Sequence, residues 1–242
     1  MTLPPMTMRI VERPSPNFND RPAGAPIDMI VMHYTGMKTA EEALQRLTEA
    51  ASKVSAHYTI DEDGTIYRHV AEAKRAWHAG VSHWAGVSNL NDRSVGIEIV
   101  NPGHEFGYRE FPEPQIAAVI ELGKAIRGRH GIPAKRVLGH SDIAPKRKVD
   151  PGELFPWKRL AAAGLGVWVE GPRMDISRSI QIPDIQQDLA AIGYECPATG
   201  VFDDDTRAVI TAFQRHWRPK LVTGIPDGET ALLAGLVRRA TA

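Results

Sequence analysis

Apolar residues occur in short runs over the first two thirds of the chain, and polar or chain-breaking residues separate these runs. The run at 28–32 leads into His33-Tyr34 and is typical of a strand that is buried on both faces. Alternation over 94–100 predicts a strand with one apolar face and with Glu98 on the other face. Asp63-Gly64, between two further runs, favours a hairpin. The predicted strands are 28–32, 56–60, 65–69, 94–100 and 136–139.

Helical spacing of apolar residues appears three times in the same part of the chain. Thr39 is suited to cap the first helix, with Glu42 three residues later as its partner. Gly131 is expected to end the second helix. The predicted helices are 39–51, 114–129 and 157–163. Strands interleaved with helices indicate an α/β domain whose mixed central sheet is covered by helices.

The pattern changes after about Ala163. Residues 164–172 are rich in chain-breaking residues and indicate a linker or covering segment. From about Ser177 onward the pattern is helical, with helices expected at 183–192, 204–217 and 228–239. Gly-x-x-Asp-x-x-Thr occurs twice there, from Gly200 and from Gly224, and each Asp can cap the following helix. An alternative is that this repeat is no more than two capped helices.

These observations predict two domains. The first covers residues 1–170, and the second, residues 171–242, is a small three-helix unit.

Composition excludes several classes of function. Lys+Arg and Asp+Glu both number 29, so the basic excess expected of a nucleic-acid-binding protein is missing. No run of about 18 apolar residues is present, which argues against a membrane-spanning helix. Cys196 is the only cysteine, so an intrachain disulfide is impossible and any metal site must use histidine and carboxylate.

Three residues in the first part have the chemistry of such a site. His33 and His140 each follow a predicted strand, and Asp150 comes ten residues after His140. Two imidazoles and one carboxylate match a catalytic zinc site, which uses three protein ligands and keeps one position open. Spacing alone also fits three unrelated polar residues in loops.

The amino-acid sequence of several segments, among them those that contain His33, His140 and Asp150, closely resembles that of the zinc-dependent N-acetylmuramoyl-L-alanine amidases. This is the type-2 amidase family, which is related to the peptidoglycan recognition proteins. The resemblance covers roughly residues 10–165, with the segments in the same order and at similar spacings. The segments are Ser15-Pro-Asn-Phe-Asn-Asp-Arg-Pro22, Val31-Met-His-Tyr-Thr35, Val54-Ser-Ala-His-Tyr-Thr-Ile60, Val95-Gly-Ile-Glu-Ile99, Gly139-His-Ser-Asp-Ile-Ala-Pro145 and Lys148-Val-Asp-Pro-Gly152.

The second part has a resemblance of its own, to the helical peptidoglycan-binding module. It is carried by Ile185-Gln-Gln-Asp-Leu189, Gly193-Tyr194, Gly200-Val-Phe-Asp203, Thr206 and Phe213-Gln214. The two sets of motifs are independent and indicate the same polymer. This implies a wall-binding domain that is separate from the active site.

The resemblance to the amidases implies one zinc ion per chain, held by His33, His140 and Asp150. It also implies that Glu98 and Lys148 act in catalysis. Glu98 could take a proton from water and pass it to the leaving amine, and Lys148 could stabilise the oxyanion. Alternatively, Glu98 only orients a ligand or pairs with Lys148, and Lys148 is a solvated surface cation.

A second group of residues is considered for substrate binding. Trp offers a stacking face, His a donor, and Arg suits the carboxylates of a peptide stem. Turn-forming or surface roles are the alternative for each. The candidates are Trp77, His78, Asn89, Asn91 and Arg93. Two other histidines, His57 and His69, are expected to be structural, and Asp142 is considered as an orienting partner of His140.

The resulting hypothesis is a zinc amidase that cleaves the bond between N-acetylmuramic acid and L-alanine in peptidoglycan or soluble muropeptides. A non-catalytic peptidoglycan-recognition protein is the alternative, and an unrelated zinc peptidase is a third possibility. We expect a monomer without nucleic-acid partners. The first ten residues lack the pattern of a secretory signal, which favours the cytoplasm, with the periplasm or cell envelope as the alternative.

Overall fold

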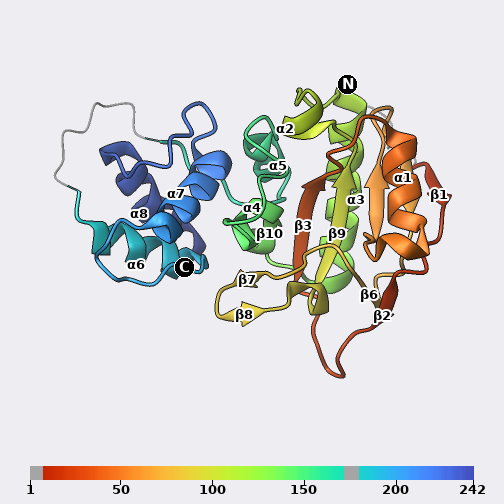
Figure 1. Cartoon of the computed structure of the whole chain (residues 1–242), viewed down its shortest axis with the longest axis horizontal. Helices are drawn as coiled ribbons and strands as arrows, with labels where there is room; N and C mark the ends of the chain where they lie inside the picture. Colours follow the sequence, from red (N-terminus) through yellow and green to blue (C-terminus); the bar gives the residue numbers. More distant parts are fainter. Residues whose placement is uncertain (1–7, 172–179) are drawn as a thin grey trace. The chain divides into compact units, whose positions relative to one another are not determined.

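The computed structural model describes residues 8–171 and 180–242 (Figure 1). Its contacts divide the chain into two compact units, and each unit is built from separate stretches of sequence. Unit 1 consists of Met1–His78 and Asn91–Pro133, and unit 2 of Ala79–Leu90 and Ala134–Ala242. The predicted domain boundary near residue 170 stays a prediction.

The main sheet has six strands in the order β1-β5-β4-β9-β3-β10. Strand β4 is antiparallel to β5, whereas the pairs β1–β5, β4–β9 and β9–β3 are parallel, so the predicted mixed sheet is confirmed. Its strands are β1 (Ile10–Glu12), β3 (Met29–Tyr34), β4 (Tyr58–Ile60), β5 (Ile66–Arg68), β9 (Ser94–Ile99) and β10 (Val137–Gly139). Two small antiparallel sheets pair β2 (Phe18–Asp20) with β6 (Lys74–Ala76) and β7 (His83–Trp84) with β8 (Val87–Ser88).

Strands β3 and β9 form the centre of the core in unit 1. In β9 every residue is buried except Glu98, which is half-buried. Neighbouring side chains of a strand point to opposite faces, so a strand buried at nearly every position is covered on both faces. This explains why residues 29–32 of β3 form a continuous apolar run and why Glu98 stands out as the one charged residue of β9.

Helix α1 (Ala40–Thr48) begins as predicted, because the Thr39 side chain accepts a hydrogen bond from the Glu42 N–H at 3.2 Å. It ends three residues earlier than expected, since Glu49 is extended and Ala50–Ser52 forms a separate 3-10 turn. Helix α3 (Glu113–His130) ends at Gly131, whose φ of 65° is the left-handed conformation that glycine favours. The other short helices of the first two thirds are α2 (Gly103–Phe106), α4 (His140–Ile143), α5 (Trp157–Ala162) and the 3-10 turns Leu90–Asp92 and Ala134–Arg136.

From residue 180 onward, where the structure describes the C-terminal part, there are three helices, α6 (Ile182–Ile192), α7 (Asp204–Trp217) and α8 (Gly228–Thr241). Both predicted caps are confirmed, because Asp203 accepts from the Thr206 N–H and Asp227 from the Thr230 N–H, each at 2.8 Å. The predicted start near Ser177 lies outside the described residues.

The repeat extends further than the sequence motif indicates. Gln186 of α6 donates to Thr206 Oγ1 and accepts from the Gly200 N–H, and both residues belong to the first copy. In the second copy, Gln214 of α7 donates to Thr230 Oγ1 and accepts from the Gly224 N–H. Both glutamines are fully buried, so each joint between two helices is fixed by the same set of hydrogen bonds. The repeat is therefore more than two capped helices.

Among the described residues, no helix combines the length and the apolar character needed to cross a membrane.

Candidate functional site

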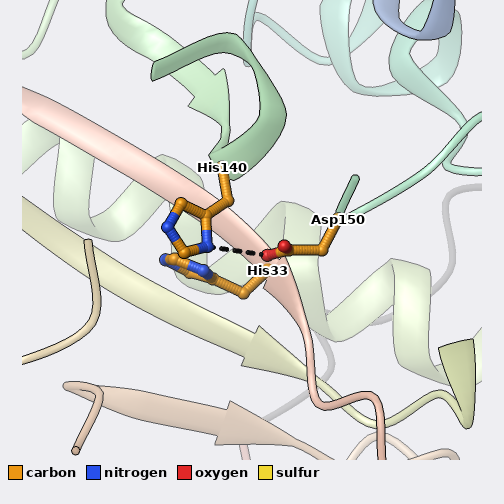
Figure 2. A group of neighbouring side chains, drawn as sticks. All are labelled: His33, His140 and Asp150. Carbon is orange, nitrogen blue, oxygen red and sulfur yellow. Dashed lines mark hydrogen bonds and ion pairs between the residues drawn. The ribbon is translucent and has the colours of Figure 1, made fainter. Parts of the chain in front are cut away.

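The three predicted metal ligands converge (Figure 2). His33 lies near the end of β3, His140 is the first residue of α4, and Asp150 lies in the loop that follows. One potential ligand atom from each lies within 4.8 Å of the others, and the three residues are only 1%, 3% and 6% exposed. Two buried imidazoles and a buried carboxylate at this spacing fit the donor set of a tetrahedral zinc ion.

His140 and Asp150 are held together by the backbone as well as by their side chains. The Ser141 N–H donates to the Asp150 carbonyl at 2.8 Å, and His140 Nδ1 lies 3.0 Å from Asp150 Oδ2. On the other side of the ring, His140 Nε2 lies 3.1 Å from the carbonyl oxygen of Ala79. When Nε2–H donates to this carbonyl, the lone pair of Nδ1 faces the carboxylate, and a shared cation satisfies both groups.

His33 is oriented from behind by a second histidine. His33 Nε2 lies 3.0 Å from His78 Nδ1, and His78 Nε2 lies 3.2 Å from Ser94 Oγ. Both contacts are compatible with tautomers in which His78 Nε2–H donates to Ser94 Oγ and His33 Nε2–H donates to His78 Nδ1. The lone pair of His33 then lies on Nδ1, as a metal-ligating imidazole requires.

The space for the His78 ring is created by Gly96 of β9. A Cβ atom at this position would lie 2.4 Å from Cγ of His78 and 2.6 Å from Cδ2. The ring therefore occupies the volume that any other residue at position 96 would fill. Gly96 belongs to the family-like segment Val95-Gly-Ile-Glu-Ile99, and its lack of a side chain leaves room for the His78 ring.

Glu98 is placed beside the first ligand by the sheet register. His33 of β3 and Glu98 of β9 are directly paired in the parallel ladder. Paired residues of adjacent parallel strands project from the same face and lie about 5 Å apart along the hydrogen-bonding direction. Glu98 is half-buried, which suits a carboxylate that exchanges protons with a bound water.

Lys148 lies two residues before Asp150 and is half-buried. Its backbone N–H donates to the Ala144 carbonyl at 3.0 Å, which fixes the course of the chain between the second and third candidate ligands. Its role in oxyanion stabilisation stays a prediction.

The residues considered for substrate binding make several contacts inside the protein. Trp77 is half-buried, and its indole N–H donates to Asn19 Oδ1 at 2.7 Å. Asn91 is buried and accepts a hydrogen bond from the His78 N–H, while Arg93 forms an ion pair with Asp28.

Of the same group, His78 is buried behind His33, and Asn89 is exposed in a left-handed conformation with a φ of 56°. A substrate contact of any of the five stays a prediction.

Sequence reasoning gave no role to Arg21, although it belongs to one of the family-like segments. Its guanidinium donates to the backbone carbonyls of Asn91 and Ser94 at 2.9 and 2.8 Å. Asn91 and Ser94 both contact His78, so Arg21 fixes the backbone of two residues around the orienting histidine. Burial lowers the pKa of Arg21 to about 10, which leaves the side chain charged at neutral pH.

The two histidines of the hairpin region have internal partners. His57 is fully buried, and its Nδ1 accepts a hydrogen bond from the Gly96 N–H at 3.0 Å. Burial, with the charge of Arg21 as the second cause, lowers the pKa of His57 to about 3, so its ring is neutral at physiological pH. His69 lies between the Arg13 carbonyl and Thr59 Oγ1. These contacts fit the structural roles expected of both.

Comparison with known families gives two matches along the chain. The profile of the N-acetylmuramoyl-L-alanine amidases (Amidase_2) matches residues 23–153, which is more than half of the sequence. The profile of a peptidoglycan binding domain (PG_binding_1) matches residues 178–232.

Individual relatives agree with the first profile. The chain is 37% identical to the N-acetylmuramoyl-L-alanine amidase AmiD of Escherichia coli (strain K12) over 227 residues, which cover 86% of this chain and 81% of AmiD. It is 32% identical to the 1,6-anhydro-N-acetylmuramyl-L-alanine amidase AmpD of Haemophilus influenzae over 163 residues, which cover 60% of this chain and 86% of AmpD.

A solved structure of AmiD from E. coli, in complex with the substrate anhydro-N-acetylmuramic acid-L-Ala-D-gamma-Glu-L-Lys, is similar throughout. The TM-score is 0.80 at 35% identity, and the match covers 92% of this chain and 93% of that chain.

Proposed function

The chain belongs to the N-acetylmuramoyl-L-alanine amidase family, and from this we propose that it hydrolyses the amide between N-acetylmuramic acid and L-alanine with one zinc ion. The observation that carries the zinc assignment is the convergence of His33, His140 and Asp150 within 4.8 Å in the protein interior. All three ligand positions are filled by residues that bind zinc, which favours an enzyme over a protein that only recognises peptidoglycan.

Amide hydrolysis needs a nucleophilic water, a stabilised oxyanion and a proton for the leaving amine. Zinc, when bound, supplies a water of lowered pKa and polarises the carbonyl group. Glu98 is adjacent to His33 in the sheet and acts as the general base that takes the water proton and delivers it to the amine nitrogen. Lys148 contributes a fixed positive charge for the oxyanion.

Residues that contact the far side of each imidazole ring orient the two histidine ligands. The carbonyl of Ala79 and the ring of His78 accept the outward-facing N–H groups of His140 and His33. Such contacts fix the ring tautomers and raise the basicity of the nitrogen that faces the metal. The same buried arrangement excludes bulk water from the ligands.

The substrate is a muramyl peptide, either within the wall polymer or as a soluble fragment. AmiD, in the solved complex, binds the substrate anhydro-N-acetylmuramic acid-L-Ala-D-gamma-Glu-L-Lys, and the C-terminal part of this chain matches a peptidoglycan binding domain. We propose that this part holds the enzyme on the polymer, which raises the local concentration of cleavable bonds. The protein acts as a monomer, in the cytoplasm or, as the alternative, in the periplasm or cell envelope.

Mass analysis of digestion products tests the activity. Purified protein loaded with zinc is incubated with intact sacculi and, in parallel, with soluble muramyl peptides. The proposal expects release of whole stem peptides that begin with L-alanine, and loss of the products after chelation. Release of shorter peptides would indicate a peptidase, and binding of sacculi without any product would indicate a recognition protein.

Comparison of the two substrates also bears on the compartment. Efficient digestion of sacculi favours the envelope, whereas turnover restricted to soluble fragments favours the cytoplasm. Cell fractionation provides the direct measurement.

A further inference from the structure

The carboxylate of Asp142 is the most enclosed acidic group near the candidate metal centre. It is 1% exposed and lies two residues after His140, in the same short helix. Its Oδ2 accepts a hydrogen bond from the Gly139 N–H at 2.8 Å, which closes the turn that presents His140. Asp142 therefore acts on the backbone of this turn, whereas the His140 ring contacts Ala79 and Asp150.

Two residues of the C-terminal helical part bind the same carboxylate. The Tyr194 hydroxyl donates to Asp142 Oδ1 at 2.6 Å, and His216 Nδ1 lies 2.7 Å from Asp142 Oδ2. A buried carboxylate is costly unless donors surround it, and these two supply what the single backbone N–H cannot. Burial, together with the charge of Asp142, raises the pKa of Tyr194 well above its ordinary value, so the hydroxyl remains a donor.

Both donors are held rigidly by aromatic neighbours. The His216 ring is stacked between Trp157 of α5 and Trp217, with centroid distances of 3.9 and 4.3 Å. The Tyr194 ring packs edge-on against Trp84 at 4.8 Å. Both donors are thus packed against aromatic rings, which favours fixed positions for the two groups that contact the Asp142 carboxylate.

The turn at Gly139, which presents His140, is also closely packed against Pro151 and Trp157. A Cβ atom at Gly139 would lie 2.9 Å from Cδ of Pro151 and 3.2 Å from the Trp157 ring. Pro151 directly follows the third candidate ligand, and Trp157 is the ring on which His216 is stacked. The turn at Gly139, the Asp150 loop and the C-terminal helical part thus meet at one packed point within unit 2.

We propose that Tyr194 and His216 are positioning residues of the metal site. Through Asp142 they hold the turn from Gly139 to Asp142, and with it the imidazole of His140. The C-terminal helical part then has two tasks, anchoring on the polymer and support of the catalytic loop. This departs from the expectation, drawn from sequence, of an anchor separate from the active site, and it rests on the proposed zinc amidase function.

Zinc affinity of conservative variants tests the inference directly. Tyr194→Phe removes one hydroxyl, His216→Leu removes the second donor, and His216→Asn restores an N–H near the position of Nδ1. The matched control is Tyr58→Phe, because the Tyr58 hydroxyl donates to the carboxylate of Glu72 at 2.7 Å in unit 1. Zinc dissociation constants are measured on the full chain by competition with a chelating dye, and folding is followed by thermal melting.

We expect Tyr194→Phe and His216→Leu to weaken zinc binding by about tenfold, the lower end of the range for residues that orient metal ligands. The value of kcat should fall with little change in KM, and His216→Asn should recover most of the affinity. Tyr58→Phe should lower the melting temperature to a similar extent without changing zinc affinity. The absorption spectrum of the cobalt-substituted protein should change in the first two variants and not in the control.

Unchanged zinc affinity and an unchanged cobalt spectrum in Tyr194→Phe and His216→Leu, with only a lower melting temperature, would overturn the inference. The inference would also be overturned if Tyr58→Phe weakened zinc binding as much as Tyr194→Phe and His216→Leu do. Because zinc affinity is measured without substrate, a native protein that binds zinc but cleaves no muramyl peptide overturns only the proposed activity. A native protein that takes up no zinc overturns both.

Discussion

Substituting Gly96 by alanine is a sharp test of how the first candidate ligand is oriented. The added methyl group would lie 2.4 Å from Cγ of His78, whereas carbon atoms in contact are normally about 3.5–4.0 Å apart. The His78 ring must therefore move by about 1 Å or more. Its contacts with His33 and Ser94, at 3.0 and 3.2 Å, would then exceed hydrogen-bonding distance.

The displacement has two separable costs. Overpacking of the core costs about 1–3 kcal/mol of the free energy of unfolding. The His33 ring also loses the acceptor for its outward N–H, and loss of such a partner typically weakens metal binding by about 10–100-fold. We therefore expect Gly96→Ala to lower both the melting temperature and zinc affinity. The main-chain φ at this position needs no glycine, so the effect arises from the ring alone.

A double-mutant cycle with His78→Ala identifies the cause. Removing the ring removes the three atoms nearest to the methyl group at position 96, so Gly96→Ala should cost little zinc affinity in the His78→Ala background. Gly128→Ala serves as the control, because a Cβ atom there meets nothing within 4 Å and helix α3 favours alanine. Unchanged zinc affinity in Gly96→Ala, or an equal loss in both backgrounds, would refute the reasoning.

Three further predictions concern the metal, the catalytic groups and pH. Alanine at any one of the three candidate ligands should lower zinc content and turnover together, and full zinc content in all three variants would contradict the assignment. Glu98→Ala should keep zinc but lower kcat by about 10²–10⁴-fold, and Lys148→Met should lower kcat more than it raises KM; near-normal kcat in Glu98→Ala would indicate a structural role. The pKa of His57 is about 3 in the folded protein and about 6.5 when unfolded, so the unfolded state binds more protons in between. The free energy of unfolding should therefore decrease as pH falls from about 6.5 towards 3, by up to about 1.4 kcal/mol per pH unit, and His57→Gln should flatten this slope in denaturant titrations.

The parts of the fold that the sequence predicts are those with local causes. The apolar run that forms β3, the Asp63-Gly64 turn and the caps at Thr39, Asp203 and Asp227 depend on residues a few positions apart. The three candidate ligands could be found because His33 and His140 lie at the ends of strands, Asp150 follows ten residues after His140, and the segments that contain them match the motifs of a known family. Short elements with weak periodicity, such as β7 with β8, have no such signal.

Contacts between distant residues could not be predicted in this way. Asp142 and His216 are 74 positions apart, and neither local sequence pattern predicts that the two side chains are in contact. Gln186 and Gln214 occupy ordinary helical positions, and their roles depend on loops that fold back onto them. Gly96 is a similar case, since its small size matters only once the His78 ring is in place.

The discontinuous course of the chain has a consequence for protein synthesis. Unit 2 takes up residues 79–90 early in the sequence and is completed only by residues 134–242. At about 5–20 residues per second, translation of that last part takes on the order of 5–20 s. The Trp84 side chain, 4% exposed in the finished protein, packs against the Tyr194 ring, so it lacks this cover until synthesis has passed Tyr194 within that last part. Chains that terminate early therefore present an uncovered tryptophan to chaperones and proteases.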